Sequence, residues 1–272
     1  MKIVCVGDCG VDHYLPTDRL LCGGITSNFA RQARKVFPTD DEIQVVSAIG
    51  SDTHAANLAR SAVEKPGFQS DITMMDGCTP VQFIEIEPTG EKNFIRYYEG
   101  VLQHFRINDS HEKLIAAADL LVTPVFLQIR GLFDSVMAAP QPALTAVDFA
   151  DFASHPDFDH LEAYLDKIEL AFFGLADEHD EEIRRIGELA AAHNKLLIVT
   201  LGAAGCRAFH GSTEYERAAI EVPQVIDTTG AGDAFAAGFL SRYGHGASIP
   251  ESLESGAQLA AKTVQHQGAV AD

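Results

Sequence analysis

The chain has 272 residues, of which 46% are hydrophobic, and its 39 Asp and Glu outnumber its 20 Lys and Arg to give a net charge of −19. This length and hydrophobicity are typical of one large globular α/β domain with a sizeable core. The negative charge argues against nucleic acid or an anionic membrane as a partner. The five cysteines form no CxxC pair and the first apolar run is too short for a signal peptide, so we expect reduced thiols in a cytoplasmic protein.

Residues 3–6 form an apolar run that ends at Gly7-Asp8, which predicts a buried strand of a parallel sheet. Asp12 falls in the loop expected after this strand. Loops at the carboxyl ends of parallel strands line the ligand crevice of an α/β fold, so Asp12 is placed to accept hydrogen bonds from the hydroxyl groups of a ligand. A turn-forming aspartate is an equally good interpretation of its spacing alone.

Gly23-Gly24 precede Ser27 and Asn28 and predict a loop that meets a helix. A helix cap explains these residues without any ligand. Glycine backbone and an asparagine amide also suit a polyol, because each offers directional donors and acceptors.

Residues 43–49 predict a second strand, followed by a helix over 53–63, with Asp52 either as the helix cap or as a residue near a pocket. Residues 71–98 alternate as strands do, with a turn at 88–90, and predict a hairpin-rich insert. Adjacent residues of a strand point to opposite faces, so at most one of Tyr97 and Tyr98 faces a pocket.

From residue 111 the pattern alternates between helices and strands, the strands lying at 120–123, 143–147, 168–173 and 196–200. This alternation predicts βα units and a parallel sheet. Four residues of metal-ligand type, His155, Asp157, Asp159 and His160, lack a known ligand spacing, which favours a polar loop.

The segment 225–240 begins apolar, passes through a Thr/Gly run and continues into a helix predicted over 231–243. A glycine-rich loop that feeds a helix leaves backbone N–H groups directed at one point, which suits an anion. Gly230 and Gly232 allow a ligand to approach the backbone closely. A carboxylate beside a phosphate is electrostatically unfavourable, and Asp233 is explained there if it accepts a hydroxyl proton during phosphoryl transfer. The helix dipole alone also favours an aspartate at this position.

The sequence DTTGAGDAFAAGF at 227–239 resembles the C-terminal signature of the ribokinase-like (PfkB) family of sugar kinases. Residues 23–30 match a GGxxxNxA pattern that resembles the N-terminal signature of the same family, and residues 200–205 match its TLGxxG turn. The resemblance implies a ribokinase-like three-layer α/β/α sandwich with a mostly parallel central sheet. It also implies a single kinase domain over residues 1–272, with a small β lid formed by about 11–21 and 71–99.

The resemblance further implies roles for individual residues. Asp233 is expected to be the catalytic base, with Gly230, Ala231 and Gly232 as the anion hole for the transferred phosphate. The sugar is expected to bind Asp12, Gly23, Gly24, Asn28 and Tyr97. ATP is expected to bind Thr200, Gly202, Gly205, Thr228 and Gly268. The family's NxxE motif for Mg²⁺ is altered, with Gly174 at the Asn position, so Asp177, or Glu178 in its place, is expected to organise Mg²⁺ through water; use of K⁺ is left open.

Residues 97–101, 148–151 and 261–269 resemble the members of the family that phosphorylate fructosamines such as fructoselysine on the 6-hydroxyl. The expected reaction is transfer of the γ-phosphoryl group of ATP to a primary hydroxyl of a small-molecule sugar. Two alternatives are a kinase for another ketohexose, polyol or nucleoside, and a sugar-binding protein of the same fold without turnover, which the missing Asn at Gly174 suggests. Lids of this family make dimer contacts in some members, so a homodimer through the lid is a further expectation.

Overall fold

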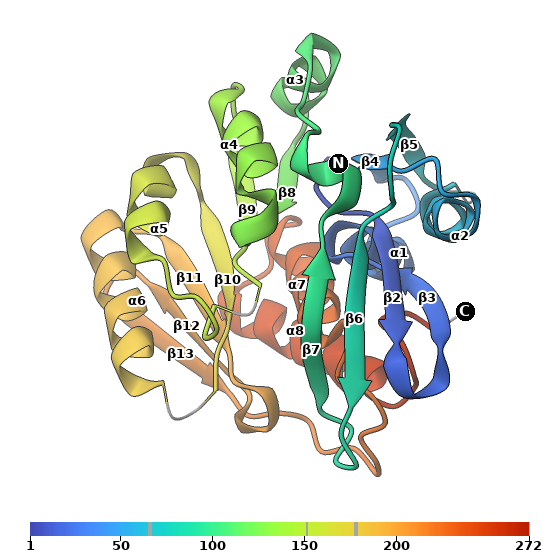
Figure 1. The fold of residues 1–272 in the computed structure, drawn as a ribbon. Helices are drawn as coiled ribbons and strands as arrows, with labels where there is room; N and C mark the ends of the chain where they lie inside the picture. The colour runs from blue at the N-terminus through green and yellow to red at the C-terminus, as the bar shows by residue number, and fades with distance from the viewer. Residues whose placement is uncertain (65–66, 151, 177–178, 272) are drawn as a thin grey trace.

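The computed structural model describes residues 1–64, 67–150, 152–176 and 179–271 (Figure 1). Over these residues, nine strands form a central sheet. In spatial order they are β13 (Thr213–Arg217), β12 (Cys206–His210), β11 (Leu196–Thr200), β10 (Leu170–Gly174), β9 (Leu144–Asp148), β8 (Leu120–Pro124), β1 (Lys2–Val6), β4 (Glu42–Ile49) and β5 (Gln69–Met74). The strands from β11 to β5 pair in parallel, whereas β12 and β13 pair antiparallel.

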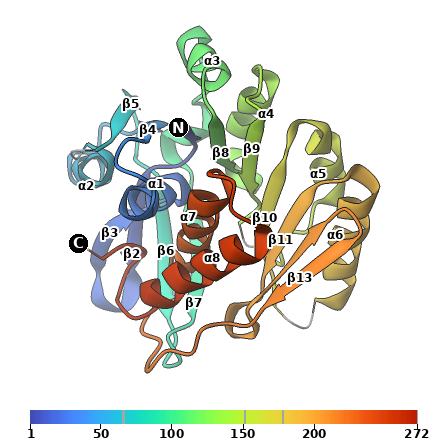
Figure 2. The same ribbon diagram turned by 180° about the vertical axis from the view of Figure 1, so that it is seen from behind.

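Helices cover both faces of this sheet (Figures 1 and 2), so the predicted three-layer architecture is confirmed. Alternate residues of a strand point to opposite faces; Ile3 and Cys5 lie in one core, and Val4 and Val6 lie in another. The first face packs against α1 (Ile25–Val36), α2 (Thr53–Val63), α7 (Ala231–Tyr243) and α8 (Ile249–Thr263). The second face packs against α3 (Asp109–Ala116), α4 (Arg130–Ala138), α5 (Phe158–Tyr164) and α6 (Asp180–His193).

The smaller sheet is the lid. It consists of β3 (Arg19–Gly23), β2 (Gly10–Tyr14), β6 (Val81–Ile86) and β7 (Lys92–Tyr98), in that spatial order. The β2–β3 and β6–β7 pairs are antiparallel, and β2 joins the two pairs by pairing in parallel with β6. The second predicted lid segment, 71–99, begins too early, because residues 71–74 belong to β5, which pairs with β4 in the central sheet.

Asp52 anchors the chain where it enters the lid. The sequence left open whether this residue caps α2, and its side chain makes no capping bond. Instead its Oδ1 accepts hydrogen bonds from the backbone N (2.7 Å) and the hydroxyl (2.6 Å) of Thr79, two residues before β6. The entry to β6 is thereby tied to the loop that follows β4.

Two sequence-based expectations elsewhere are wrong in detail. The polar segment predicted as a loop around 155–160 begins a helix at Phe158, because the Asp157 side chain accepts from the His160 backbone N at 3.0 Å and caps α5. Residues 250–266, with small apolar residues on one side, predict a last helix of that length, whereas α8 ends at Thr263. Among the described residues, no group of three or more His, Cys, Asp or Glu is arranged to hold a metal ion, and none of the helices has the length and apolarity needed to cross a membrane.

Candidate active site

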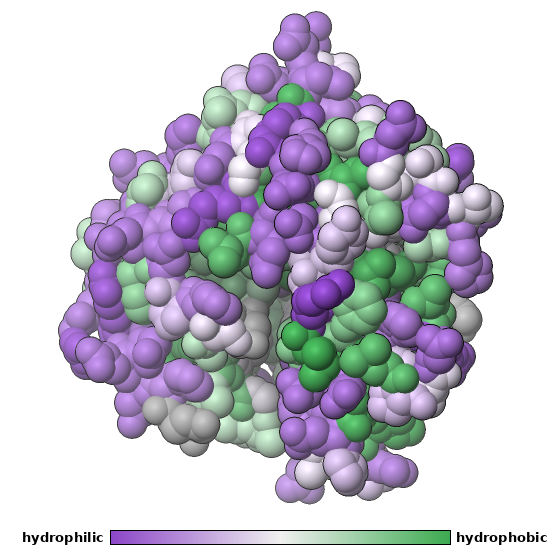
Figure 3. Space-filling model, in the orientation of Figure 1, coloured by the Kyte–Doolittle hydropathy of each residue, from purple (hydrophilic) through white to green (hydrophobic). Residues whose placement is uncertain are grey.

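The glycine-rich turn and α7 lie at the carboxyl edge of the central sheet, beside the lid, where Figure 3 shows a hollow between the lid and the rest of the molecule. Gly230 has φ 75°, a left-handed conformation that favours glycine, and a Cβ there would lie 2.3 Å from the Cβ of Ala269. By contrast, a Cβ at Gly232 would meet nothing within 4 Å. The first turn of α7 is therefore open to a ligand at Gly232, as an anion site requires, whereas the N of Ala231 donates to the O of Thr228 at 3.2 Å.

Asp233 lies in this first turn with 7% of its surface exposed. Its Oδ2 accepts a hydrogen bond of 2.9 Å from Nδ2 of Asn28, which projects from the first turn of α1, 205 residues away in the chain. Asn28 is also buried, and its Oδ1 has no hydrogen-bond partner among the described residues. The structure thus brings two of the predicted site residues into contact and leaves an acceptor atom beside them for a ligand.

Asp12 lies within β2 and not in a loop after the first strand, which corrects the prediction. It is 3% exposed, and its Oδ2 has no partner in the part of the chain that the structure describes. Gly23 and Gly24 lie directly against two aspartates: a Cβ at Gly23 would be 2.2 Å from Oδ1 of Asp12, and a Cβ at Gly24 would be 2.6 Å from the backbone O of Asp8. The two glycines are needed because any side chain there would displace these groups.

Asp8 is a site residue that the sequence analysis missed. Its Oδ2 accepts from the N of Ile25 at 3.2 Å and its Oδ1 accepts from the N of Thr26 at 3.3 Å, so it caps α1 from the end of the neighbouring strand β1. The cap orients the helix turn that carries Asn28. The position of Asp8 at the carboxyl end of a buried strand was the signal that could have identified it.

Tyr97, on β7, faces the interior, and Tyr98 faces outward with 43% exposure. The Tyr97 ring packs edge-on against Phe126, with 5.0 Å between ring centroids. Its hydroxyl is buried and has no partner among the described residues. Burial raises the pKa of this phenol, and the negative charge of Asp8 adds to the rise. The two tyrosines thus lie on opposite faces of the strand as predicted, and contact of Tyr97 with a sugar stays a prediction.

Several carboxyl groups converge around Asp233. Burial raises the pKa of Asp233 well above its ordinary value, the charge of Asp148 adds to the rise, and the hydrogen bond from Asn28 opposes it. Burial likewise raises the pKa of Asp12, with further contributions from Asp8 and Asp227. Asp148, at the end of β9, has its pKa raised to about 6 by burial. A carboxylate with a raised pKa is a stronger base, and this cluster would be stabilised by a bound cation.

The predicted nucleotide residues lie in two groups. Gly202 has φ 54° and open space around it, whereas a Cβ at Gly205 would lie 2.2 Å from the backbone O of Arg217. Thr200 ends β11 and donates its hydroxyl to the O of Phe173 at 3.3 Å. Contact of these residues with ATP stays a prediction.

Thr228 and Gly268 are held by other parts of the chain. The Thr228 hydroxyl accepts from the N of Lys92 at 3.0 Å and donates to Glu91, so it is engaged by the turn between β6 and β7. The N of Gly268 donates to Oδ2 of Asp227 at 2.8 Å. Their predicted role toward ATP is untested, and Asp177 and Glu178, the predicted Mg²⁺ residues, lie outside the described residues.

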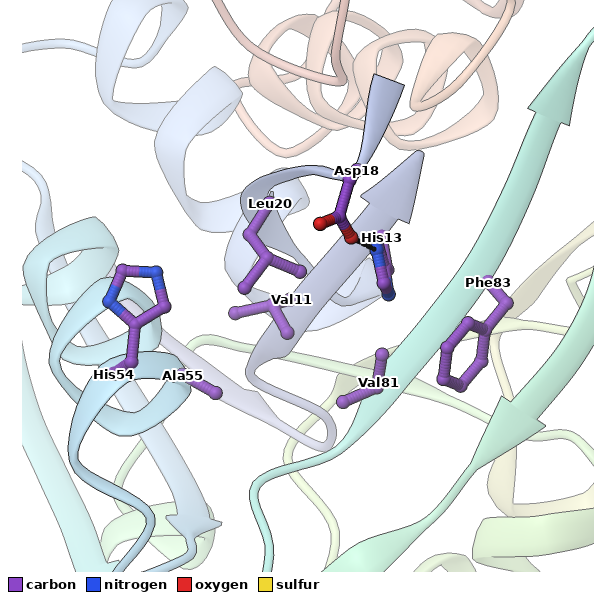
Figure 4. Close-up of a pocket in the computed structure, with 8 residues that line it drawn as sticks. All are labelled: Val11, His13, Asp18, Leu20, His54, Ala55, Val81 and Phe83. Carbon is purple, nitrogen blue, oxygen red and sulfur yellow. Dashed lines mark hydrogen bonds and ion pairs between the residues drawn. The ribbon is translucent and has the colours of Figure 1, made fainter. Parts of the chain in front are cut away.

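A separate hollow of about 470 Å³ lies on the outer face of the lid, against α2 (Figure 4). Val11 and His13 line it, and because they flank Asp12 on the same strand they point away from the face that Asp12 occupies. None of the predicted site residues lines this hollow. Its lining comprises Val11, His13, Asp18, Leu20, His54, Ala55, Val81 and Phe83.

Solved structures identify the class to which this fold belongs. Ribokinase from Giardia lamblia superposes with a TM-score of 0.81 and 20% sequence identity, covering 98% of this chain and 94% of that one. Adenosine kinase from Sinorhizobium meliloti superposes with a TM-score of 0.80 and 20% identity, covering 99% and 95%. The fold is that of the ribokinase-like kinases.

Sequence comparison gives the family. Residues 2–272 match the pfkB family carbohydrate kinase model. Fructoselysine 6-kinase from Escherichia coli K12 is 30% identical over 267 residues, which is 97% of each chain, and fructosamine kinase FrlD from Bacillus subtilis 168 is 27% identical over 273 residues, 99% of this chain and 93% of that one. The chain belongs to the pfkB family and is an ATP-dependent sugar kinase.

The buried carboxylate of Asp8 leads to a prediction about stability. Burial raises its pKa from 3.8 to about 6, so between these values the folded state keeps a proton that the unfolded state releases. Stability should therefore fall as pH rises from about 4 to about 6. In Asp8→Asn the free energy of unfolding should decrease less over this pH range, by up to about 3 kcal/mol. The substitution also weakens the cap of α1. Urea unfolding at pH 4.5, 5.5 and 7 measures the slope.

The exposed Asp40→Asn variant is the control for this series, and it should keep the wild-type dependence on pH. A slope in Asp8→Asn equal to that of wild type would contradict the assignment of the buried proton to Asp8.

Proposed function

We propose that this kinase phosphorylates the 6-hydroxyl of a fructosamine such as fructoselysine. Two relatives, named fructoselysine 6-kinase and fructosamine kinase FrlD, support this substrate class, since both align over nearly the whole chain. The observation that carries the proposal is the buried Asn28–Asp233 contact at the start of α7, together with Asp12 on the lid, whose Oδ2 has no partner among the described residues.

In the proposed reaction, Asp233 accepts the proton of the attacking hydroxyl, and Asn28 orients its carboxylate. The backbone N–H groups of Gly230, Ala231 and Gly232 stabilise negative charge on the transferred phosphoryl group. Asp12, Gly23, Gly24, Asn28 and Tyr97 hold the sugar. Thr200, Gly202, Gly205, Thr228 and Gly268 are proposed to face ATP.

The charge of the site supports an amine-bearing substrate. Asp8, Asp12, Asp148 and Asp233 are close enough for their charges to raise one another's pKa values. The secondary amine of a fructosamine is protonated near neutral pH, so it would relieve this repulsion, whereas fructose itself has no charge.

We further propose Mg²⁺ as the divalent cation, brought by ATP and organised through water by Asp177 or Glu178. The carboxylate of Asp148 fits the oxygen ligands that Mg²⁺ prefers. Magnesium would neutralise charge on the phosphates. Whether K⁺ is needed is tested by comparing turnover in potassium and tetramethylammonium salts.

A cytoplasmic location and a homodimer through the lid are retained as proposals. The five cysteines are free thiols, which suits a reducing compartment.

Phe94, Ile95 and Tyr98 of β7 expose 43%, 48% and 43% of their surfaces, and Figure 3 shows apolar side chains gathered over the lid. Sedimentation of wild type and Ile95→Asp tests the dimer.

The substrate test is ADP formation from Mg²⁺·ATP with four acceptors: Nε-fructosyl-lysine, fructose, ribose and adenosine. We expect kcat/KM for Nε-fructosyl-lysine to exceed that for fructose about 100-fold, the discrimination that about 2.7 kcal/mol gives. The amine is tested by N-acetylated 1-amino-1-deoxyfructose beside the free amine. A preference for ribose or adenosine would overturn the proposed substrate and leave the kinase activity intact.

A further inference from the structure

We propose that Tyr14 is a positioning residue that couples sugar binding under the lid to the phosphate-binding turn through Asp227. Tyr14 ends β2, and its hydroxyl donates to Oδ2 of Asp227 at 2.7 Å, across 213 residues of sequence. Both residues are buried, with 2% and 0% of their surfaces exposed. The bond joins the lid directly to the segment that leads into α7.

Asp227 serves as the common acceptor for three parts of the chain. Besides Tyr14, its Oδ1 accepts from the N of Thr229 at 2.8 Å and its Oδ2 accepts from the N of Gly268 at 2.8 Å. Thr229 immediately precedes Gly230, whose close contact with Ala269 fixes the turn on the same C-terminal segment. A shift of Tyr14 therefore moves the acceptor that shapes the anion hole.

The other lid hairpin reaches the same segment. The turn between β6 and β7 lies beside residues 225–228 in both ribbon views (Figures 1 and 2). The N of Thr228 donates to the O of Gly90 at 3.0 Å, and the Thr228 hydroxyl accepts from the N of Lys92. The two hairpins of the lid are thus hydrogen-bonded to the adjacent residues Asp227 and Thr228.

Asp12 and Tyr14 lie two positions apart on β2, so they share one face of the lid and are separated by about 6.6 Å along the strand. Asp12 is proposed to bind the sugar, and Tyr14 binds Asp227. A short strand transmits the position of one side chain to the other, so a sugar that orders Asp12 favours the turn geometry that ATP requires. By linkage, the same coupling makes ATP tighten sugar binding. This inference rests on the proposed sites for sugar and phosphate, and it does not depend on which sugar is used.

The experiment measures the Kd of the ATP analogue AMP-PNP with Mg²⁺, with and without the sugar that the enzyme turns over fastest. In wild type we expect the sugar to tighten AMP-PNP binding at least about 5-fold, the lower end of typical coupling. In Tyr14→Phe we expect this factor to fall to between 1 and about 2 and kcat to fall about 10-fold. The sugar Kd without nucleotide should stay within about 3-fold, because Asp12 is unchanged.

Tyr98→Phe is the matched control, since Tyr98 is an exposed lid tyrosine on the opposite face, and it should retain the full coupling factor. Thr228→Ala removes the hydroxyl bonds to Lys92 and Glu91 and keeps the backbone bond to Gly90, so it should reduce the coupling in the same direction even if Tyr14→Phe folds poorly. Absence of coupling in wild type, or an unchanged factor in a folded Tyr14→Phe, would overturn the inference. Loss of turnover with every sugar in wild type would instead overturn the proposed function.

Discussion

Asp233→Asn is expected to lower kcat about 10³-fold and to change the binding of sugar and AMP-PNP by no more than about 3-fold. An amide cannot accept the proton of the attacking hydroxyl, and general-base catalysis typically contributes 10²–10⁴-fold. The side chain keeps its size, and the Asn28 Nδ2 donor can still bond to an amide oxygen. Steady-state kinetics together with calorimetric binding measure the two effects separately.

The same assignment predicts the pH profile of the wild-type enzyme. Because burial and Asp148 raise the pKa of Asp233, its active, ionised form should be lost at a higher pH than an ordinary aspartate would show. The acidic limb of kcat/KM should therefore lie above the ordinary carboxyl range and disappear from the residual activity of Asp233→Asn. Asp180→Asn, an exposed aspartate in the first turn of α6, is the control and should behave as wild type. Wild-type turnover in Asp233→Asn would mean that another group is the base.

Asp12→Asn is expected to weaken sugar binding about 100-fold and, at the same time, to make the free protein more stable. A hydrogen bond to a charged group contributes about 1.5–3 kcal/mol, so loss of the carboxylate should raise KM for the sugar accordingly. In the absence of ligand, however, the carboxylate is buried, and its Oδ2 has no partner in the described structure. Burial raises the pKa of Asp12, so its cost to stability grows as pH rises.

The gain in the free energy of unfolding should therefore be larger at pH 8 than at pH 5, and it is expected to be about 1 kcal/mol or more at the higher pH. Urea unfolding at both pH values measures it, beside KM for the sugar. Asp76→Asn changes an exposed aspartate outside the lid sheet and should alter neither quantity. A loss of stability in Asp12→Asn at pH 8 would show that the carboxylate is satisfied by its surroundings.

Local sequence was sufficient to predict α7, since the glycine-rich run and the apolar helix adjoin one another in the chain, and the role expected of its first turn stays a prediction. Local sequence was insufficient to place Asp12 in a strand of the lid. The residues 10–14, GVDHY, have no strong strand pattern, and they form β2 because Val11 to Tyr14 pair with Val81 to Ile84, about 70 positions later. Such pairing is a tertiary effect that overrides local preference.

Asp8 and Asp148 were missed for a different reason. Asp148 ends β9 and Asp8 follows the end of β1 by two residues, so the rule that placed Asp12 near a ligand applied to them equally. Their burial and mutual charge appear only when the strands are side by side. The Asn28–Asp233 contact likewise joins helices whose packing no local pattern encodes. The type and order of the elements were thus predictable, whereas the electrostatics of the site were not.

The parallel pairing of β2 with β6 has a mechanical consequence. It joins two hairpins from distant parts of the sequence into one continuous plate, with four paired positions along the seam. Neither hairpin can tilt alone without breaking these bonds, so the lid should swing as a rigid body about its connections near Gly10 and Thr79. In hydrogen exchange, the amides along the seam should then stay protected together even while the hollow beneath them opens and fills with solvent.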